Sequence, residues 1–158
     1  MLDETISEDG TLNSKLLDEL YYETLDLSSF VVEYFQKNNK ENYQILNDGL
    51  MVFYTSECNR ITTGIMQAMS WCLMQKGVRS GEITAQEAGA EESRLSDSSL
   101  FDEPIGCDTE KFPSEFLEYS ERTRKVYKRI VRLDRLLYEL EAGKNNPVHG
   151  LMNKIEEL

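Results

Sequence analysis

Apolar residues recur every three or four positions along three long stretches of the chain, which is the period of an amphipathic helix. The stretches span residues 12–37, 43–76 and 113–142. The most regular stripe, in the third stretch, consists of Phe116, Tyr119, Thr123, Val126, Ile130, Leu133, Leu137 and Leu140. A shorter helix is predicted over residues 84–95, because the run Thr-Ala-Gln-Glu that starts at Thr84 is a capping box. The pattern predicts an all-α fold: an up-down-up three-helix bundle with a short accessory helix.

Polar and turn-forming residues separate the predicted helices. Residues 38–42 are polar and favour caps and turns, and Gly77 predicts the end of the second helix. Residues 96–112 read as a long irregular linker, and a linker of this length is usually functional or mobile. We therefore expect one helical bundle domain over residues 1–143 and a flexible C-terminal tail over residues 144–158.

The second helix is apolar around most of its circumference, which indicates a central helix with neighbours on more than one side. Small residues spaced by four would let another helix approach closely; they are Gly64, Ala68 and Cys72. Bundle or dimer contacts are expected at Glu57, Arg60, Gly64, Ala68 and Trp71. Because the three helices carry more apolar surface than one small core hides, we also predict a homodimer.

A polar stripe crosses the same helix, and it comprises Ser56, Arg60, Thr63, Gln67 and Ser70. The stripe either faces solvent or forms a partly buried network, in which every polar atom would need a partner. Glu57 and Arg60 are three residues apart and can form an ion pair. If that pair is partly buried, Arg60 keeps further donors for a second partner.

The charge of the chain is uneven. With 17 Lys and Arg against 29 Asp and Glu in 158 residues, the net charge is −12 and the pI is about 4.6, which argues against a nucleic-acid binder. Residues 122–135 hold seven basic residues and one acid, a net +6 that leaves −18 for the rest. This segment is either a solvated face or a docking surface for an acidic partner or the acidic helices of the same fold, with nucleic acid as a weaker third reading. The docking candidates are Arg124, Lys128, Arg129 and Arg132.

The chain offers few catalytic groups. His149 is the single histidine, and the three cysteines, Cys58, Cys72 and Cys107, show no CxxC spacing. No glycine-rich phosphate loop and no Glu-x-x-His pair occurs in the sequence. We expect a protein that is not an enzyme and that uses no cofactor or metal. Without a long apolar span or a signal peptide, we expect a cytoplasmic protein with no membrane partner.

Two motifs resemble the regulator of CtrA degradation family, RcdA, of alphaproteobacteria. They are SExxRxTTxxMQxxSW over residues 56–71 and RLDRxxY over residues 132–138. Asn146-Pro147-Val148 fits the chain end of that family, and the resemblance covers about two thirds of the chain, from residue 46 to residue 148. The first 45 residues and the acidic part of the linker carry no signature of the family, so cargo or partner choice could differ there.

The resemblance implies a helical bundle that dimerises, has no enzymatic activity and helps to deliver cell-cycle regulators to the ClpXP protease. In that family, recruitment depends on a small response-regulator-like partner, CpdR. An adaptor needs two binding surfaces and no reactive groups. The two candidate surfaces are the basic face of the last helix, and the acidic linker together with the tail. The alternative is a helical dimeric regulator or scaffold that binds other proteins, or DNA, without any link to a protease.

Overall fold

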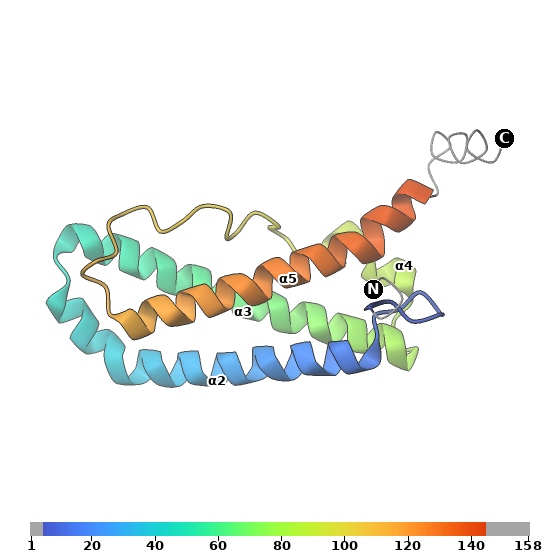
Figure 1. Cartoon of the computed structure of the whole chain (residues 1–158), viewed down its shortest axis with the longest axis horizontal. Helices are drawn as coiled ribbons and strands as arrows, with labels where there is room; N and C mark the ends of the chain where they lie inside the picture. The colour runs from blue at the N-terminus through green and yellow to red at the C-terminus, as the bar shows by residue number, and fades with distance from the viewer. Residues whose placement is uncertain (1–4, 145–158) are drawn as a thin grey trace.

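The computed structural model describes residues 5–144, with side chains to residue 139, as an elongated bundle of helices (Figure 1). In chain order the elements are α2 (Ser14–Ile45), α3 (Asp48–Ser80), α4 (Ala85–Ala88), the 3-10 helix η1 (Glu91–Ser93) and α5 (Ser114–Lys144). The described residues contain no strand, only an isolated bridge between Ile6 and Leu12. The predicted all-α fold, with three long helices and a short one, is confirmed. Apart from Lys144, the predicted tail lies outside the described residues.

The direction of α5 departs from the up-down-up order that the helix pattern predicts. Contacts between α3 and α5 advance together along both helices, since Glu57 meets Ser120 and Trp71 meets Asp134. The two helices are therefore parallel, α2 is antiparallel to both, and the order is up-down-down (Figure 1). Residues 94–113, which we name the crossover, return along the bundle and make this order possible. Extended, its 20 residues reach about 66 Å, against about 50 Å for α3.

The end of α2 also differs from the prediction, because the helix continues without a break through residues 38–42. Asn42 is buried, and its side chain donates to the hydroxyls of Tyr34 at 3.1 Å and Tyr54 at 3.0 Å. Asn42 thus lines the inside of the bundle end, while Lys40 and Glu41 of the same run are exposed. The turn comes a few residues later, where the side chain of Asn47 accepts a hydrogen bond from the first turn of α3.

The end of α3 comes at Ser80, later than Gly77 predicts. Gly81, with a φ of 82°, caps the helix in the left-handed conformation that favours glycine. Gly77 lies inside the helix, where an added Cβ would meet Ile83 Cδ1 at 2.6 Å, so this glycine permits a close return of the chain. The capping box at Thr84 forms as its motif predicts, but the α-helix that it opens is a single turn and does not reach residue 95.

The core lies between the three long helices and is covered on one side by the crossover (Figure 1). Phe101 of the crossover is fully buried and packs with Tyr127 and Val131 of α5. An added Cβ at Gly64 would lie 2.6 Å from Phe101 Cε2. The small-residue track of α3 therefore accommodates an aromatic ring of the crossover at this position.

Replacing Gly64 by alanine tests this fit. We expect Gly64→Ala to lower the free energy of unfolding by about 1–3 kcal/mol, because overpacking against Phe101 outweighs the ~1 kcal/mol gained in helix propensity. Gly49→Ala is the control, since its added Cβ meets only Asn47 Oδ1, at 3.5 Å, and this variant should be at least as stable as the wild type. Urea unfolding followed by circular dichroism measures both. Equal midpoints for the two variants would contradict the tight fit.

Candidate functional site

Glu57 and Arg60 lie at the centre of a buried cluster that holds the middle of the crossover. Glu57 accepts a hydrogen bond from Ser120 Oγ at 2.6 Å, and its other oxygen lies 2.7 Å from Arg60 Nη2. Arg60 Nη1 donates to the backbone carbonyl of Glu103 at 2.6 Å, and the guanidinium lies 5.0 Å from the centre of the Phe101 ring. Balanced by a carboxylate, the arginine binds the chain's own crossover through Nη1 and its flat face, while Nη2 contacts Glu57 as an ion pair only.

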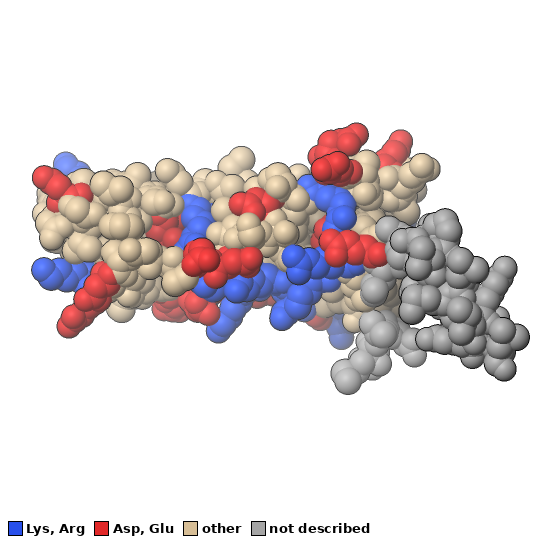
Figure 2. All heavy atoms as spheres, turned by 90° about the horizontal axis from the view of Figure 1, so that it is seen from above, with Lys and Arg blue, Asp and Glu red and all other residues tan. Residues whose placement is uncertain are grey.

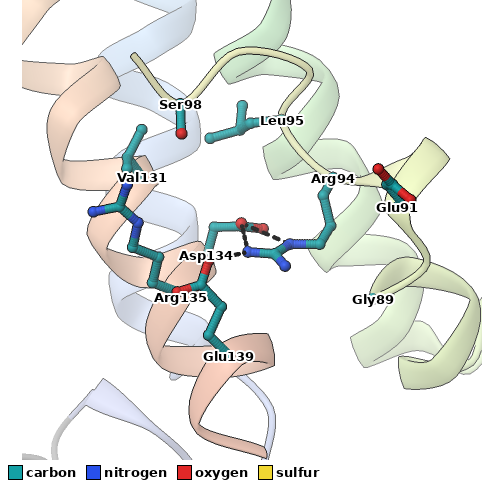
Figure 3. A pocket seen from close by; sticks show the side chains of 9 residues that line it. All are labelled: Gly89, Glu91, Arg94, Leu95, Ser98, Val131, Asp134, Arg135 and Glu139. Atoms are coloured by element: carbon teal, nitrogen blue, oxygen red, sulfur yellow. Dashed lines mark hydrogen bonds and ion pairs between the residues drawn. The ribbon is translucent and has the colours of Figure 1, made fainter. Parts of the chain in front are cut away.

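Asp134 on α5 forms the second cluster, at the start of the crossover (Figure 3). Its side chain is buried and accepts hydrogen bonds from Trp71 Nε1 at 3.0 Å and from Arg94 Nε at 2.9 Å and Nη2 at 2.6 Å. Arg94 also reaches Glu139 at 3.1 Å. The hydrogen bond to Asp134 raises the pKa of Arg94, so the guanidinium stays charged. One carboxylate thus joins α3, α5 and the crossover.

Two tyrosines of α5, the buried Tyr127 and the half-buried Tyr138, add neutral contacts beside these ion pairs. Tyr127 shares its proton between Gln67 Oε1, 2.7 Å away, and the backbone carbonyl of Asp97. Gln75 Nε2 donates to the hydroxyl of Tyr138 at 2.7 Å. Burial raises the pKa of Tyr127 to about 12 and raises that of Tyr138, so both hydroxyls stay protonated and serve as structural hydrogen-bonding groups at neutral pH.

A pocket of about 430 Å³ opens beside Asp134, between α5 and the segment that contains η1 (Figure 3). Its residues are Gly89, Glu91, Arg94, Leu95, Ser98, Val131, Asp134, Arg135 and Glu139. The charge of Arg94 is already balanced there by two carboxylates, and the set contains no histidine, cysteine or lysine. Arg94, Asp134 and Glu139 of this pocket are paired with one another, and the arrangement assembles no nucleophile with a base.

The two buried thiols are poorly suited to nucleophilic chemistry. Burial raises the pKa of Cys58 to about 11 and that of Cys72 to about 12, so both thiols are protonated at neutral pH, and the thiolate is the reactive form. Within residues 5–144 no group of three or more His, Cys, Asp or Glu side chains could hold a metal ion. In the same part of the chain no helix has the length and apolar character that crossing a membrane requires. His149 lies outside the described residues.

The basic residues of α5 gather over the middle of the bundle, with acidic side chains around them (Figure 2). Of the four predicted docking residues, Arg124 donates to the carbonyl of Glu103 at 3.4 Å and lies 3.8 Å from Glu121, and Arg129 lies 3.4 Å from Glu23. The other two are Lys128 and Arg132, which are exposed. Among the described residues, neither of these two makes an ion pair or a hydrogen bond. The predicted set therefore divides into partly engaged and free cations.

The predicted contact residues of α3 all face the interior of this single chain. Ala68 lies in the core, Gly64 lies under Phe101, and Trp71 reaches Asp134. The polar stripe divides in two: Arg60 and Gln67 bind the crossover and α5, while the remaining members, Ser56, Thr63 and Ser70, are exposed. The solvent-facing reading thus holds for three members, and the partly buried network for two.

Sequence reasoning misses four residues that complete these clusters, and they are Arg94, Phe101, Ser120 and Asp134. The sequence offers one indication that Asp134 is special, since it is the single acid among the seven basic residues of 122–135 and lies inside the RLDRxxY motif. Its partner Arg94 is 40 positions away in an irregular segment, which no helical period reveals.

The fold and these clusters define a class: an all-α bundle in which a long crossover is fastened across two parallel helices by buried carboxylates. The chain belongs to the family described as a protein of unknown function (DUF1465), whose model matches residues 8–158. This is the RcdA family, so the assignment from the two motifs is confirmed. The crystal structure of RcdA from Caulobacter crescentus CB15 is similar, with 25% sequence identity, a TM-score of 0.62 and coverage of 87% of this chain and 98% of that chain. No curated protein matches the sequence.

Removing the charge of Asp134 tests its role as an anchor. We expect Asp134→Asn to lower the free energy of unfolding by about 2–4 kcal/mol, because Arg94 loses the carboxylate that compensates its partly buried charge. Glu139→Gln is the control, since the other carboxylate on Arg94 is 54% exposed and should contribute less than ~1 kcal/mol. Urea unfolding gives both values, and limited proteolysis shows whether cleavage within residues 94–113 increases. A stable Asp134→Asn variant with an uncleaved crossover would contradict the anchor.

Proposed function

We propose that this protein is a non-enzymatic adaptor of the cytoplasm that helps to deliver cell-cycle regulators to the ClpXP protease through protein–protein contacts. A CpdR-like response regulator is the proposed partner in recruitment. Membership of the RcdA family and the likeness to the Caulobacter RcdA structure support this proposal. The observation that carries it is the division of polar groups: the buried ones hold the crossover, while free cations remain on the outer face of α5. Such an arrangement favours binding over catalysis.

Adaptor activity can be measured in a reconstituted degradation assay. The components are ClpX, ClpP, ATP, the CpdR-like response regulator and a cell-cycle regulator from the same organism. We expect this protein to accelerate loss of the substrate, because tethering raises the local concentration of substrate at the protease. The acceleration should disappear when the response regulator is omitted. If the protein leaves the degradation rate unchanged with all components present, the protease link is wrong and the scaffold without such a link is preferred.

We also propose that two copies of the chain associate through the outer face that α2 and α3 share. Between Asp48 and Lys76 the helix α3 has two charged residues, Glu57 and Arg60, and both face the crossover side. Exposed apolar side chains on the other side of α3 include Met66 and Leu73. The result is a long uncharged face on α3.

The neighbouring face of α2 continues this surface. Asp18 of α2 pairs with Lys76 of α3 at 2.6 Å. The side of α2 that carries Asp18 therefore lies next to α3. Leu25 and Val32 follow at intervals of seven on that side, and both are exposed. The two helices thus share an outer surface on which exposed apolar side chains recur, and a two-fold contact between identical chains can cover such a surface.

A charge at the centre of this face should separate the copies. We expect light scattering after size exclusion to give twice the 18.3 kDa chain mass for the wild type and a single chain mass for Met66→Glu. Ile45→Glu is the matched control, since Ile45 is 63% exposed against 67% for Met66 and lies at the end of α2. Circular dichroism checks that both variants are folded. A wild-type monomer, or a dimeric Met66→Glu variant, would contradict this contact.

A further inference from the structure

An open depression of about 480 Å³ lies on the outer surface of the bundle, beside the basic residues of α5. It is lined by Glu23 of α2 and by Glu121, Arg124, Lys125, Val126, Lys128, Arg129 and Arg132 of α5. Its two acids each lie beside an arginine: Glu121 is 3.8 Å from Arg124, and Glu23 is 3.4 Å from Arg129. We name it the basic groove. Arg124 also donates to the crossover carbonyl of Glu103, but among the described residues the other cations of the groove make no hydrogen bond or ion pair with the crossover and are available for a different purpose.

The free cations of the groove form one ordered row. Lys125, Lys128 and Arg132 are exposed, and within residues 5–144 none of them makes a hydrogen bond or an ion pair. They follow one another at intervals of three and four, so they lie along one stripe of α5. From Lys125 to Arg132 the stripe is about 10 Å long, since a helix rises about 1.5 Å per residue.

Arg129 adds a cation that an incoming carboxylate can recruit. Its Nη1 lies 3.4 Å from Glu23 Oε2, a long contact between two partly exposed side chains. Exposed pairs of this kind contribute little stability. A carboxylate that enters the groove can therefore replace Glu23 as the partner of Arg129.

We propose that the basic groove binds a short, flexible acidic segment of a partner protein. The inference rests on the proposed function, because the segment would belong to a protein that the adaptor brings to the protease. In an extended chain, alternate side chains are about 6.6 Å apart, so carboxylates at positions i, i+2 and i+4 span about 13 Å. That span matches the row of three free cations with Arg129 beside it.

The charge of the rest of the molecule determines the kind of partner. Outside residues 122–135 the chain carries −18, and surface charges act over roughly 10 Å at 0.1 M salt. An acidic globular surface would meet this negative charge as well as the groove, whereas a flexible segment can enter the groove alone. Duplex DNA carries one charge per ~1.7 Å over a long rod, so most of its phosphates would lie against acidic surface.

Binding is measured by fluorescence anisotropy at 150 mM salt, with a labelled ten-residue peptide of alternating Glu and Ala and the corresponding Gln-Ala peptide. We expect the acidic peptide to bind and the neutral one not to bind. Lys128→Glu with Arg132→Glu should raise the Kd at least about tenfold. The control, Lys15→Glu with Lys40→Glu, changes the net charge equally at exposed positions of α2 and should leave the Kd within about twofold.

A third variant reverses the sign of the effect. Glu23→Gln frees Arg129 and removes a carboxylate that repels the peptide, so the Kd should fall by about two- to fivefold. The inference is overturned if the acidic peptide does not bind, if the control pair weakens binding as much as the groove pair, or if Glu23→Gln weakens it. Tighter binding of a 12-base-pair duplex than of the peptide would likewise overturn it in favour of nucleic acid.

The degradation assay separates this inference from the proposed function. If the wild type accelerates degradation and the groove pair of substitutions does not alter that rate, the groove is not used in delivery and the inference fails while the adaptor function stands. If the wild type does not accelerate degradation but the peptide binds with the expected dependence on the variants, the adaptor function fails while the groove as an acidic-segment site is supported.

Discussion

The fold depends on the buried carboxylates that fasten the crossover. A chain whose third long helix is parallel to the second must send a connection back along the bundle, and that connection has backbone groups that need partners wherever they are covered. Asp134 holds its start through Arg94, and Glu57 holds its middle through Arg60. Because each carboxylate also binds a residue of the facing helix, the same contacts align α3 with α5. Loss of Glu57 would leave Arg60 partly buried without a carboxylate, and loss of Asp134 would leave Arg94 with the exposed Glu139 alone. Either loss is more costly than loss of an exposed pair.

The same contacts determine which groups remain available for partners. Arg60 and Arg94 are occupied within the chain, and Arg124 is drawn toward the crossover by the carbonyl of Glu103. Lys128 and Arg132, on the opposite side of α5 from the core, stay exposed. The number of basic residues in the sequence therefore overestimates the proposed docking surface, since some of these residues bind other parts of the same chain. The surface that we propose for docking is a narrow row of charge on a helix, and a rigid surface loses less entropy on binding.

The sequence predicts the helices well because burial on one face imposes a period near 3.6, and it predicts Glu57 with Arg60 because residues three apart on a helix are neighbours. The direction of a helix cannot be predicted in this way, because an amphipathic stripe is the same whether the neighbouring helix is parallel or antiparallel. The orientation of α5 therefore depends on the length and path of the crossover. Gly77 and Asn42 mislead for a related reason, since turn-forming residues also occur where a helix needs a close approach or an inward amide. The partnership of Arg94 with Asp134 depends on tertiary structure that no local pattern encodes.

The two proposed surfaces occupy different sides of the bundle, and this has a consequence for binding. The row Lys125, Lys128 and Arg132 lies on the outer side of α5, whereas Met66 and Leu25 lie on the uncharged face of α3 and α2. A second copy seated on the uncharged face would leave α5 open in both chains, so a dimer would present two basic grooves. Two weak sites in one particle retain a partner with two acidic segments better than either site alone, because the second contact forms at a high effective concentration. Weak, salt-sensitive contacts of this kind would release a bound partner readily, as the proposed adaptor function requires.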